Sequence, residues 1–204
     1  PRLAAAIGAT EEVVSRSGTS EQQTRLAALR LSLSFRMERY VVSPETVEEA
    51  RRQWLQSQES GSPRQQCNAE FSLAFAQLWS GRVGEAGSHL LSCEEAAQSL
   101  HDRRLQVLVS TYLAVAARVK GDVKETERWA STAIDRAVTA HLPGYVATAK
   151  ANLAWVAQQR GDSARAERSA REALGLWESP SAYPFEWLAR WPLVAVFVGR
   201  DDLS

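Results

Sequence analysis

The residues best suited to chemistry in this 204-residue chain are three histidines and two cysteines. A metal site needs several such side chains at spacings that bring them together, and a disulfide framework needs more cysteines. His89, His101 and His141 each lack a second His or Cys at ligand spacing, so we expect them on solvated or half-buried helix surfaces. We expect Cys67 and Cys93 to be small, buried, reduced residues. The sequence therefore predicts no metal and no cofactor.

Carboxylates and glycines give no catalytic pattern either. Acidic residues come in adjacent pairs such as Glu94-Glu95, and neighbours on a helix point about 100° apart, so they do not converge as an acid–base pair would. Gly81, Gly84 and Gly87 are regularly spaced. A phosphate-binding loop, however, needs a preceding strand and a following Lys-Ser or Lys-Thr, and both are missing. We therefore predict that the protein is not an enzyme.

The charge balance bears on the choice of partner. Lys+Arg and Asp+Glu both number 24, so the formal net charge is zero, whereas nucleic acids and anionic membranes attract proteins with a cationic surface. No apolar run approaches the roughly 18 residues of a membrane span, and no signal peptide is visible. These features predict a cytoplasmic protein that contacts neither nucleic acid nor membrane directly.

An internal repeat would position any binding residues. Three segments align without gaps: FSLAFAQLWSGRVGEA from Phe71, TYLAVAARVKGDVKET from Thr111 and ANLAWVAQQRGDSARA from Ala151. Their glycines, Gly81, Gly121 and Gly161, recur with a 40-residue period, and a fourth copy begins at Leu193-Val194. A fixed period of this kind is typical of repeat proteins in which each unit packs on its neighbours.

Each unit has the pattern of a helix, a tight turn and a second helix. Apolar residues before the glycine recur at helical spacing, and the glycine supplies the left-handed conformation that ends a helix. Asp122 and Asp162 follow as N-cap residues of the second helix. Small residues on one face allow two helices to approach closely. We therefore expect burial of Ala114, Ala133, Ala154, Ala166 and Ala173.

The third copy resembles the tetratricopeptide repeat in order and spacing, through Asn152-Leu153-Ala154, Gly161-Asp162, Ala166 and Ala173-Leu174. The resemblance implies an all-α fold, a superhelical array of antiparallel helix pairs (a TPR-like α-solenoid) with about ten helices. Residues 64–204 would hold the repeats, with the last repeat truncated. Residues 1–63 would form less regular helix pairs in the same continuous domain.

The 40-residue period is longer than the 34 that is usual in that family. Units of this length resemble the helical C-terminal regions of large bacterial signalling ATPases, including LuxR/MalT-type regulators and cyclase-linked ATPases. The segment from Tyr183 to Asp202 looks particularly like the latter. The chain begins with Pro1 and stops at Ser204, so we expect it to be a piece of a longer protein. The resemblance implies a scaffold for protein–protein interaction in signal transduction or transcriptional regulation. Its partner would be a protein, a peptide or another domain of the parent chain.

In the tetratricopeptide family one column of residues lines the inner, concave face. The equivalent positions, which we predict to bind a partner, are Phe71, Phe75, Leu78, Thr111, Val115, Arg118, Trp155, Gln158 and Trp191. Either the aromatic members line a groove that holds the partner, or they pack in the core between repeats. A groove predicts that Phe75 and Trp155 are partly exposed. The alternative function is a small-molecule sensor that holds its effector in the same concavity, and it needs an enclosed pocket.

The last helix is expected to lack a packing partner. Trp187 and Trp191 lie one helical turn apart and precede Pro192, so the helix either kinks at the proline or begins there. A terminal repeat without a polar cap leaves one face uncovered. We therefore expect exposed apolar side chains on the helix that contains Trp187, Trp191 and Val194, and self-association through them.

Overall fold

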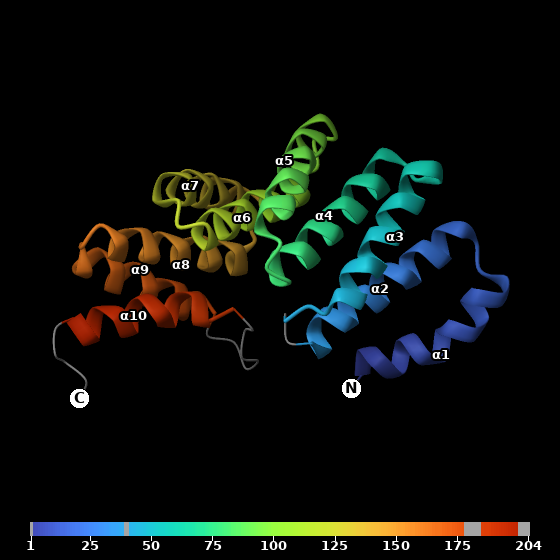
Figure 1. The fold of residues 1–204 in the computed structure, drawn as a ribbon, viewed down its shortest axis with the longest axis horizontal. Coiled ribbons are helices and arrows are strands. Elements are labelled where there is room, and N and C mark those ends of the chain that lie inside the picture. The colour runs from blue at the N-terminus through green and yellow to red at the C-terminus, as the bar shows by residue number, and fades with distance from the viewer. Residues whose placement is uncertain (1, 39–40, 178–184, 200–204) are drawn as a thin grey trace. The chain divides into compact units, whose positions relative to one another are not determined.

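The computed structural model describes residues 2–38, 41–177 and 185–199, and these residues form ten α-helices and no strand (Figure 1). The helices are α1 (Arg2–Ser17), α2 (Ser20–Met37), α3 (Pro44–Ser60), α4 (Pro63–Trp79), α5 (Val83–Ser99), α6 (Arg103–Val119), α7 (Val123–Thr139), α8 (Pro143–Gln159), α9 (Ser163–Leu176) and α10 (Trp187–Gly199). The predicted all-α array of packed helix pairs is confirmed.

The chain divides into two compact units, Pro1–His89 and Leu90–Ser204, and their boundary falls within α5. In the first unit each helix packs on the next along the chain, from α1 to α4. In the second unit α6 packs on α7, α7 on α8 and α8 on α9, while α10 packs on both α8 and α9. Packing between neighbours of this kind is what a helical repeat array requires.

The turns inside helix pairs are built on glycines with a left-handed backbone, as predicted. The φ angles of Gly81, Gly121 and Gly161 are 87°, 76° and 76°. After Gly121, the Asp122 N–H donates to Ala117 O at 2.9 Å, which closes the end of α6. The Asp122 carboxylate then caps α7 by accepting a hydrogen bond from the Glu125 N–H at 3.0 Å. Asp162 caps α9 in the same way, so both predicted N-caps are confirmed.

Two turns between helix pairs place histidine in the conformation that favours glycine. His101 and His141 have φ angles of 52° and 55°. They lie in turns, so the expectation that they occupy helix surfaces is wrong, whereas His89 does lie on α5. The same capping hydrogen bond forms here, with the Leu142 N–H donating to Ala137 O at 2.9 Å. Because an L side chain is disfavoured in this region, both turns carry strain.

The substitution His141→Gly should raise the free energy of unfolding by about 1 kcal/mol, because glycine removes this backbone strain. Gly121→Ala is the converse and should lower it by about 1–2 kcal/mol. A Cβ at Gly121 would meet no atom within 4 Å, so backbone conformation alone is tested there. Urea denaturation followed by circular dichroism measures both changes. A His141→Gly protein less stable than the wild type would show that the imidazole itself supports the turn.

Small residues fill the helix–helix contacts, as the repeat predicts. The five alanines expected to be buried (Ala114, Ala133, Ala154, Ala166 and Ala173) have no exposed surface. Cys67 and Cys93 are also buried, and neither is in a disulfide. These positions allow close approach of neighbouring helices and so set the spacing between them.

Candidate binding surface

The nine residues of the predicted column differ widely in exposure. Phe75, Leu78, Thr111 and Val115 are buried, whereas Phe71, Arg118, Trp155 and Gln158 are half-buried and Trp191 is exposed. Phe71, Phe75 and Leu78 lie on α4 in the first unit, and the other six lie on α6, α8 and α10 in the second. The column is therefore not a uniformly open surface.

Phe75 is the centre of an aromatic cluster in the first unit. Its ring centroid lies 4.9 Å from that of Phe35, 6.0 Å from that of Trp79 and 6.4 Å from that of Phe71. The side chain is only 7% exposed, so Phe75 fits the core alternative and not the groove alternative. Phe35, on α2, packs against Phe75, and the repeat pattern alone does not predict this contact. Trp155 is half-buried, as a groove residue should be.

The α10 helix begins at Trp187, so Pro192 lies inside it and does not start it. A proline has no N–H to donate to the carbonyl of Leu188, one turn earlier. Arg118 of α6 supplies a donor instead, with its Nη1 3.0 Å from Leu188 O and 3.3 Å from Ala151 O. Arg118 therefore connects α6, α8 and α10 through hydrogen bonds to the chain's own backbone.

Arg118 is also a half-buried cation. Burial lowers the pKa of its guanidinium to about 10, so the group stays protonated at neutral pH. The guanidinium carbon lies 5.7 Å from the centroid of the Trp155 ring, and Nη1 lies 3.4 Å from Asn152 Oδ1. No carboxylate in the described part of the chain forms an ion pair with it. The positive charge is therefore stabilised by neutral oxygen atoms and by the Trp155 ring.

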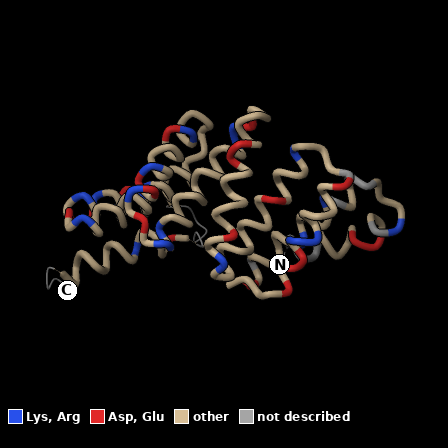
Figure 2. Tube along the Cα trace, turned by 45° about the horizontal axis from the view of Figure 1, so that its top comes forward, with Lys and Arg blue, Asp and Glu red and all other residues tan. Residues whose placement is uncertain are grey.

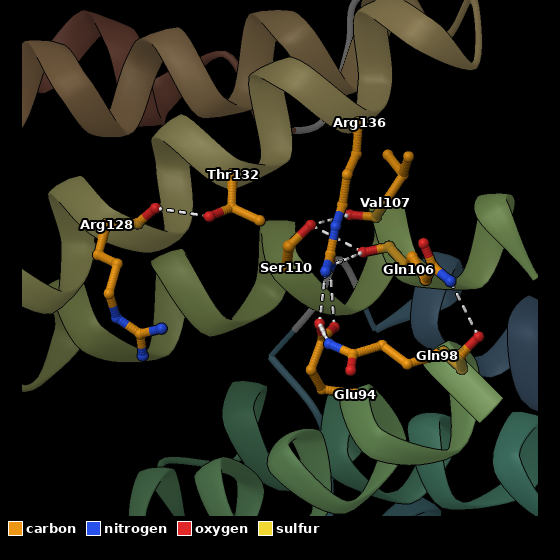
Figure 3. Close-up of polar contacts among 9 residues, drawn as sticks. Glu94, Gln98, Gln106, Val107, Ser110, Arg128, Thr132 and Arg136 are labelled. Carbon is orange, nitrogen blue, oxygen red and sulfur yellow. Dashed lines mark hydrogen bonds and ion pairs between the residues drawn. The ribbon is translucent and has the colours of Figure 1, made fainter. Parts of the chain in front are cut away.

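A second polar network, which sequence reasoning missed, joins α5, α6 and α7 (Figure 3). Glu94 is only 5% exposed. Arg136 holds it with two hydrogen bonds, from Nη1 to Oε2 at 2.9 Å and from Nη2 to Oε1 at 2.6 Å. The same Nη1 donates to Gln106 O at 3.0 Å. A bidentate pair with a buried carboxylate and a half-buried guanidinium fixes the relative position of the three helices.

The exposed face of α10 carries a stripe of four apolar side chains, which we call the α10 stripe. Trp187, Trp191, Val194 and Val198 are 40%, 64%, 48% and 54% exposed. Figure 2 shows that this last helix before the C-terminus is almost free of charged residues. The opposite face, with Leu188, Ala189 and Val196, is buried, and α10 packs on α8 and α9. The prediction of exposed apolar side chains on this helix is confirmed.

Three of the four positions of the α10 stripe are buried in the two preceding copies, whereas the equivalents of Val198, which are Gln158 and Arg118, are half-buried. One period earlier, on α8, the positions of Trp187, Trp191 and Val194 are held by Ala147, Ala151 and Ala154, all 0% exposed. Two periods earlier, on α6, they are held by Val107, Thr111 and Ala114, which are at most 1% exposed. The α10 helix therefore leaves open most of the face that α6 and α8 bury.

Two cavities lie in the second unit, and neither is lined by the predicted column. One, of about 260 Å³, is lined by Arg103, Gln106, Asp135, Arg136 and Thr139. The other, of about 360 Å³, is mainly apolar and is lined by Ala137, Val138, His141, Leu142, Pro143, Val146 and Leu176. Residues 2–38, 41–177 and 185–199 contain no group of three His, Cys, Asp or Glu side chains placed to hold a metal ion. In the same residues, no helix combines the length and the apolar character needed to cross a membrane.

Comparison with known proteins identifies a similar fold. No family model and no curated protein matches this chain. Among solved structures, the crystal structure of BtubC (BKLC) from P. vanneervenii is similar, with a TM-score of 0.69 and 13% sequence identity. The match covers 98% of this chain and 82% of that chain. At this identity the likeness supports the all-α helical array and carries no argument about function.

Proposed function

We propose that this protein is a scaffold for protein–protein interaction. The observation that supports the proposal is the concentration of exposed apolar side chains on one short helix. Of the thirteen large hydrophobic side chains exposed in the described residues, four lie on α10, a helix of 13 residues. A contiguous apolar patch marks an interaction site, and exposed tryptophans are the side chains that most often anchor a protein interface.

The setting that we propose for this scaffold is a larger cytoplasmic ATPase of bacterial signal transduction or transcriptional regulation. It rests on the resemblance of the 40-residue units to the helical regions of such proteins. The partner is then either a separate protein or another domain of the same parent chain. A small-molecule sensor has less support, because neither cavity is lined by the aromatic column.

Photo-crosslinking tests the proposal. Benzoylphenylalanine placed at Ala195, an exposed position of α10, should form an adduct with a protein when the chain is expressed in its native cells. The same probe at Val119, an exposed apolar position on α6, is the control and should give no adduct. The absence of any protein adduct at Ala195 would refute the proposal.

Trp191→Ala, combined with the probe at Ala195, should weaken partner binding by about 1–4 kcal/mol, as removal of an interface anchor does. This loss corresponds to a decrease of about fivefold to nearly a thousandfold in affinity, measured as adduct yield against partner concentration. Because Trp191 is 64% exposed, the melting temperature of the variant should stay close to that of the wild type. A loss of adduct accompanied by unfolding would instead assign Trp191 to the core.

A further inference from the structure

We infer that the α10 stripe is covered by the α10 stripe of a second copy of this chain, packed antiparallel about a two-fold axis. The inference rests on the proposed function and names the partner. It follows from three features of the stripe: the kind of element that fits it, its lack of charge, and the order of its large and small side chains.

A helix is the element that fits the stripe. Trp187, Trp191, Val194 and Val198 follow one another at intervals of four, three and four residues, which is the spacing of the buried seam in a coiled coil. The positions of α6 and α8 that are equivalent to Trp187, Trp191 and Val194 are buried in a unit made of helices. The stripe therefore continues a surface that already packs against helices within this chain.

The covering surface must also be apolar. The stripe has no charged residue, and Arg190, the one charged residue of α10, forms an ion pair with Glu186 at 2.8 Å. A partner helix with charged residues at this contact would bury them without partners, which is strongly unfavourable. Of the other exposed large hydrophobic residues of the described chain, Val138 of α7 and Leu176 of α9 line one apolar cavity, and the rest are spread over α1, α2, α3, α5, α6 and the start of residues 41–177. Among these described surfaces, α10 itself supplies the matching apolar helix.

The order of the side chains makes the stripe self-complementary. The intervals of four, three and four read the same in both directions, so a two-fold axis midway between Trp191 and Val194 brings like positions into register. This axis places Trp187 opposite Val198 of the second copy, and Trp191 opposite Val194 of the second copy. Each bulky indole then meets a smaller side chain, and the same patch serves both copies, as in a closed two-fold dimer. A parallel arrangement would place Trp against Trp and leave gaps between the valines.

Sedimentation equilibrium of the 204-residue chain tests the inference. The wild type should sediment as a dimer at micromolar concentration, and Trp191→Glu should raise the dissociation constant at least 100-fold. Val194→Glu provides a second disruption at the centre of the stripe. Val119→Glu is the matched control, since Val119 is 54% exposed but lies on α6 outside the stripe. Circular dichroism should show all three variants folded.

Cysteine crosslinking tests the antiparallel register. Residues 187 of the two copies would lie about 16 Å apart along the helix pair at 1.5 Å per residue, too far for a disulfide. Trp187→Cys alone should therefore not crosslink, whereas an equimolar mixture of Trp187→Cys and Val198→Cys should. Crosslinking of Trp187→Cys with itself would overturn the antiparallel arrangement.

A monomeric wild type at about 100 µM would overturn the second-copy inference. If a different protein is nevertheless crosslinked at Ala195, the proposed scaffold function stands with another partner on the stripe. If the adduct at Ala195 has twice the mass of the chain, both proposals are supported. A monomer that gives no adduct contradicts both.

Discussion

Replacing Arg136 by Met should lower the free energy of unfolding by about 3–5 kcal/mol, because the Glu94 carboxylate then stays buried without its partner. Glu94 is 5% exposed and accepts both of its ion-pair hydrogen bonds from Arg136. The variant also removes the donor to Gln106 O. Methionine keeps most of the apolar stem, so the effect reports the lost charge and hydrogen bonds. Denaturant titration at pH 7 measures it.

Two variants make this result specific. The double substitution Glu94→Gln/Arg136→Met should recover most of the lost stability, since no buried charge is left unpaired. Arg160→Met is the matched control, because Arg160 holds Glu127 with two hydrogen bonds of 2.7 and 2.5 Å in an exposed pair. The control should leave the unfolding midpoint near that of the wild type. Equal losses for Arg136→Met and Arg160→Met would show that burial of the pair contributes nothing.

The substitutions Arg118→Met and Pro192→Ala should be coupled, although Arg118 and Pro192 are far apart in sequence. In the wild type, Arg118→Met leaves the carbonyl of Leu188 without a donor, which costs about 1–3 kcal/mol for a buried polar group. In the Pro192→Ala background the N–H of the introduced alanine donates to that carbonyl, so the same substitution costs less. The double-mutant cycle should give a coupling energy of about 1 kcal/mol or more.

The coupling energy is the quantity to read from this cycle, because the single effect of Arg118→Met has two opposing parts. Burial lowers the pKa of Arg118 to about 10, so keeping this group protonated at neutral pH reduces stability, and methionine removes that cost. Losing the hydrogen bonds to Leu188 O and Ala151 O acts in the other direction. Additive effects of the two substitutions would show that Arg118 does not serve the carbonyl freed by Pro192.

Local signals predicted the repeat well. The left-handed glycines and the aspartate caps depend on neighbours that are close in sequence, and the buried alanines recur once per repeat period. Both kinds of signal can be recognised in the amino-acid sequence. His101 and His141 were missed because glycine alone was taken as the marker of a left-handed turn, although histidine is one of the side chains enriched in that conformation. Their own separation equals the repeat period and was a usable signal.

Contacts between residues that are far apart in sequence could not be predicted in this way. The sequence left open whether Phe75 lines a groove or packs in the core, and the answer depends on Phe35 of α2, outside the repeat pattern, which packs against it. Glu94 and Arg136 are 42 residues apart, a separation that differs from the repeat and is one of many between opposite charges. Arg118 fitted the family's concave column, yet one of its hydrogen bonds goes to Leu188 O, a carbonyl freed by a proline that occurs in one copy alone among the described repeats. These outcomes depend on which side chains the packed helices bring together.

The even spacing of the left-handed turns determines which insertions and deletions of sequence the helical array can accept. Gly81, His101, Gly121, His141 and Gly161 are evenly spaced at half the repeat period, and the helices between them, α5 to α8, have 17 residues each. One helix with its turn is thus half a period. A duplication or loss of one whole period, cut at two of these turns, preserves the alternation of first and second helices. Insertion or deletion of half a period keeps every turn intact. It places two first helices, or two second helices, next to each other, and the faces they present do not fit together. Insertions and deletions that preserve the packing therefore come in steps of a whole period.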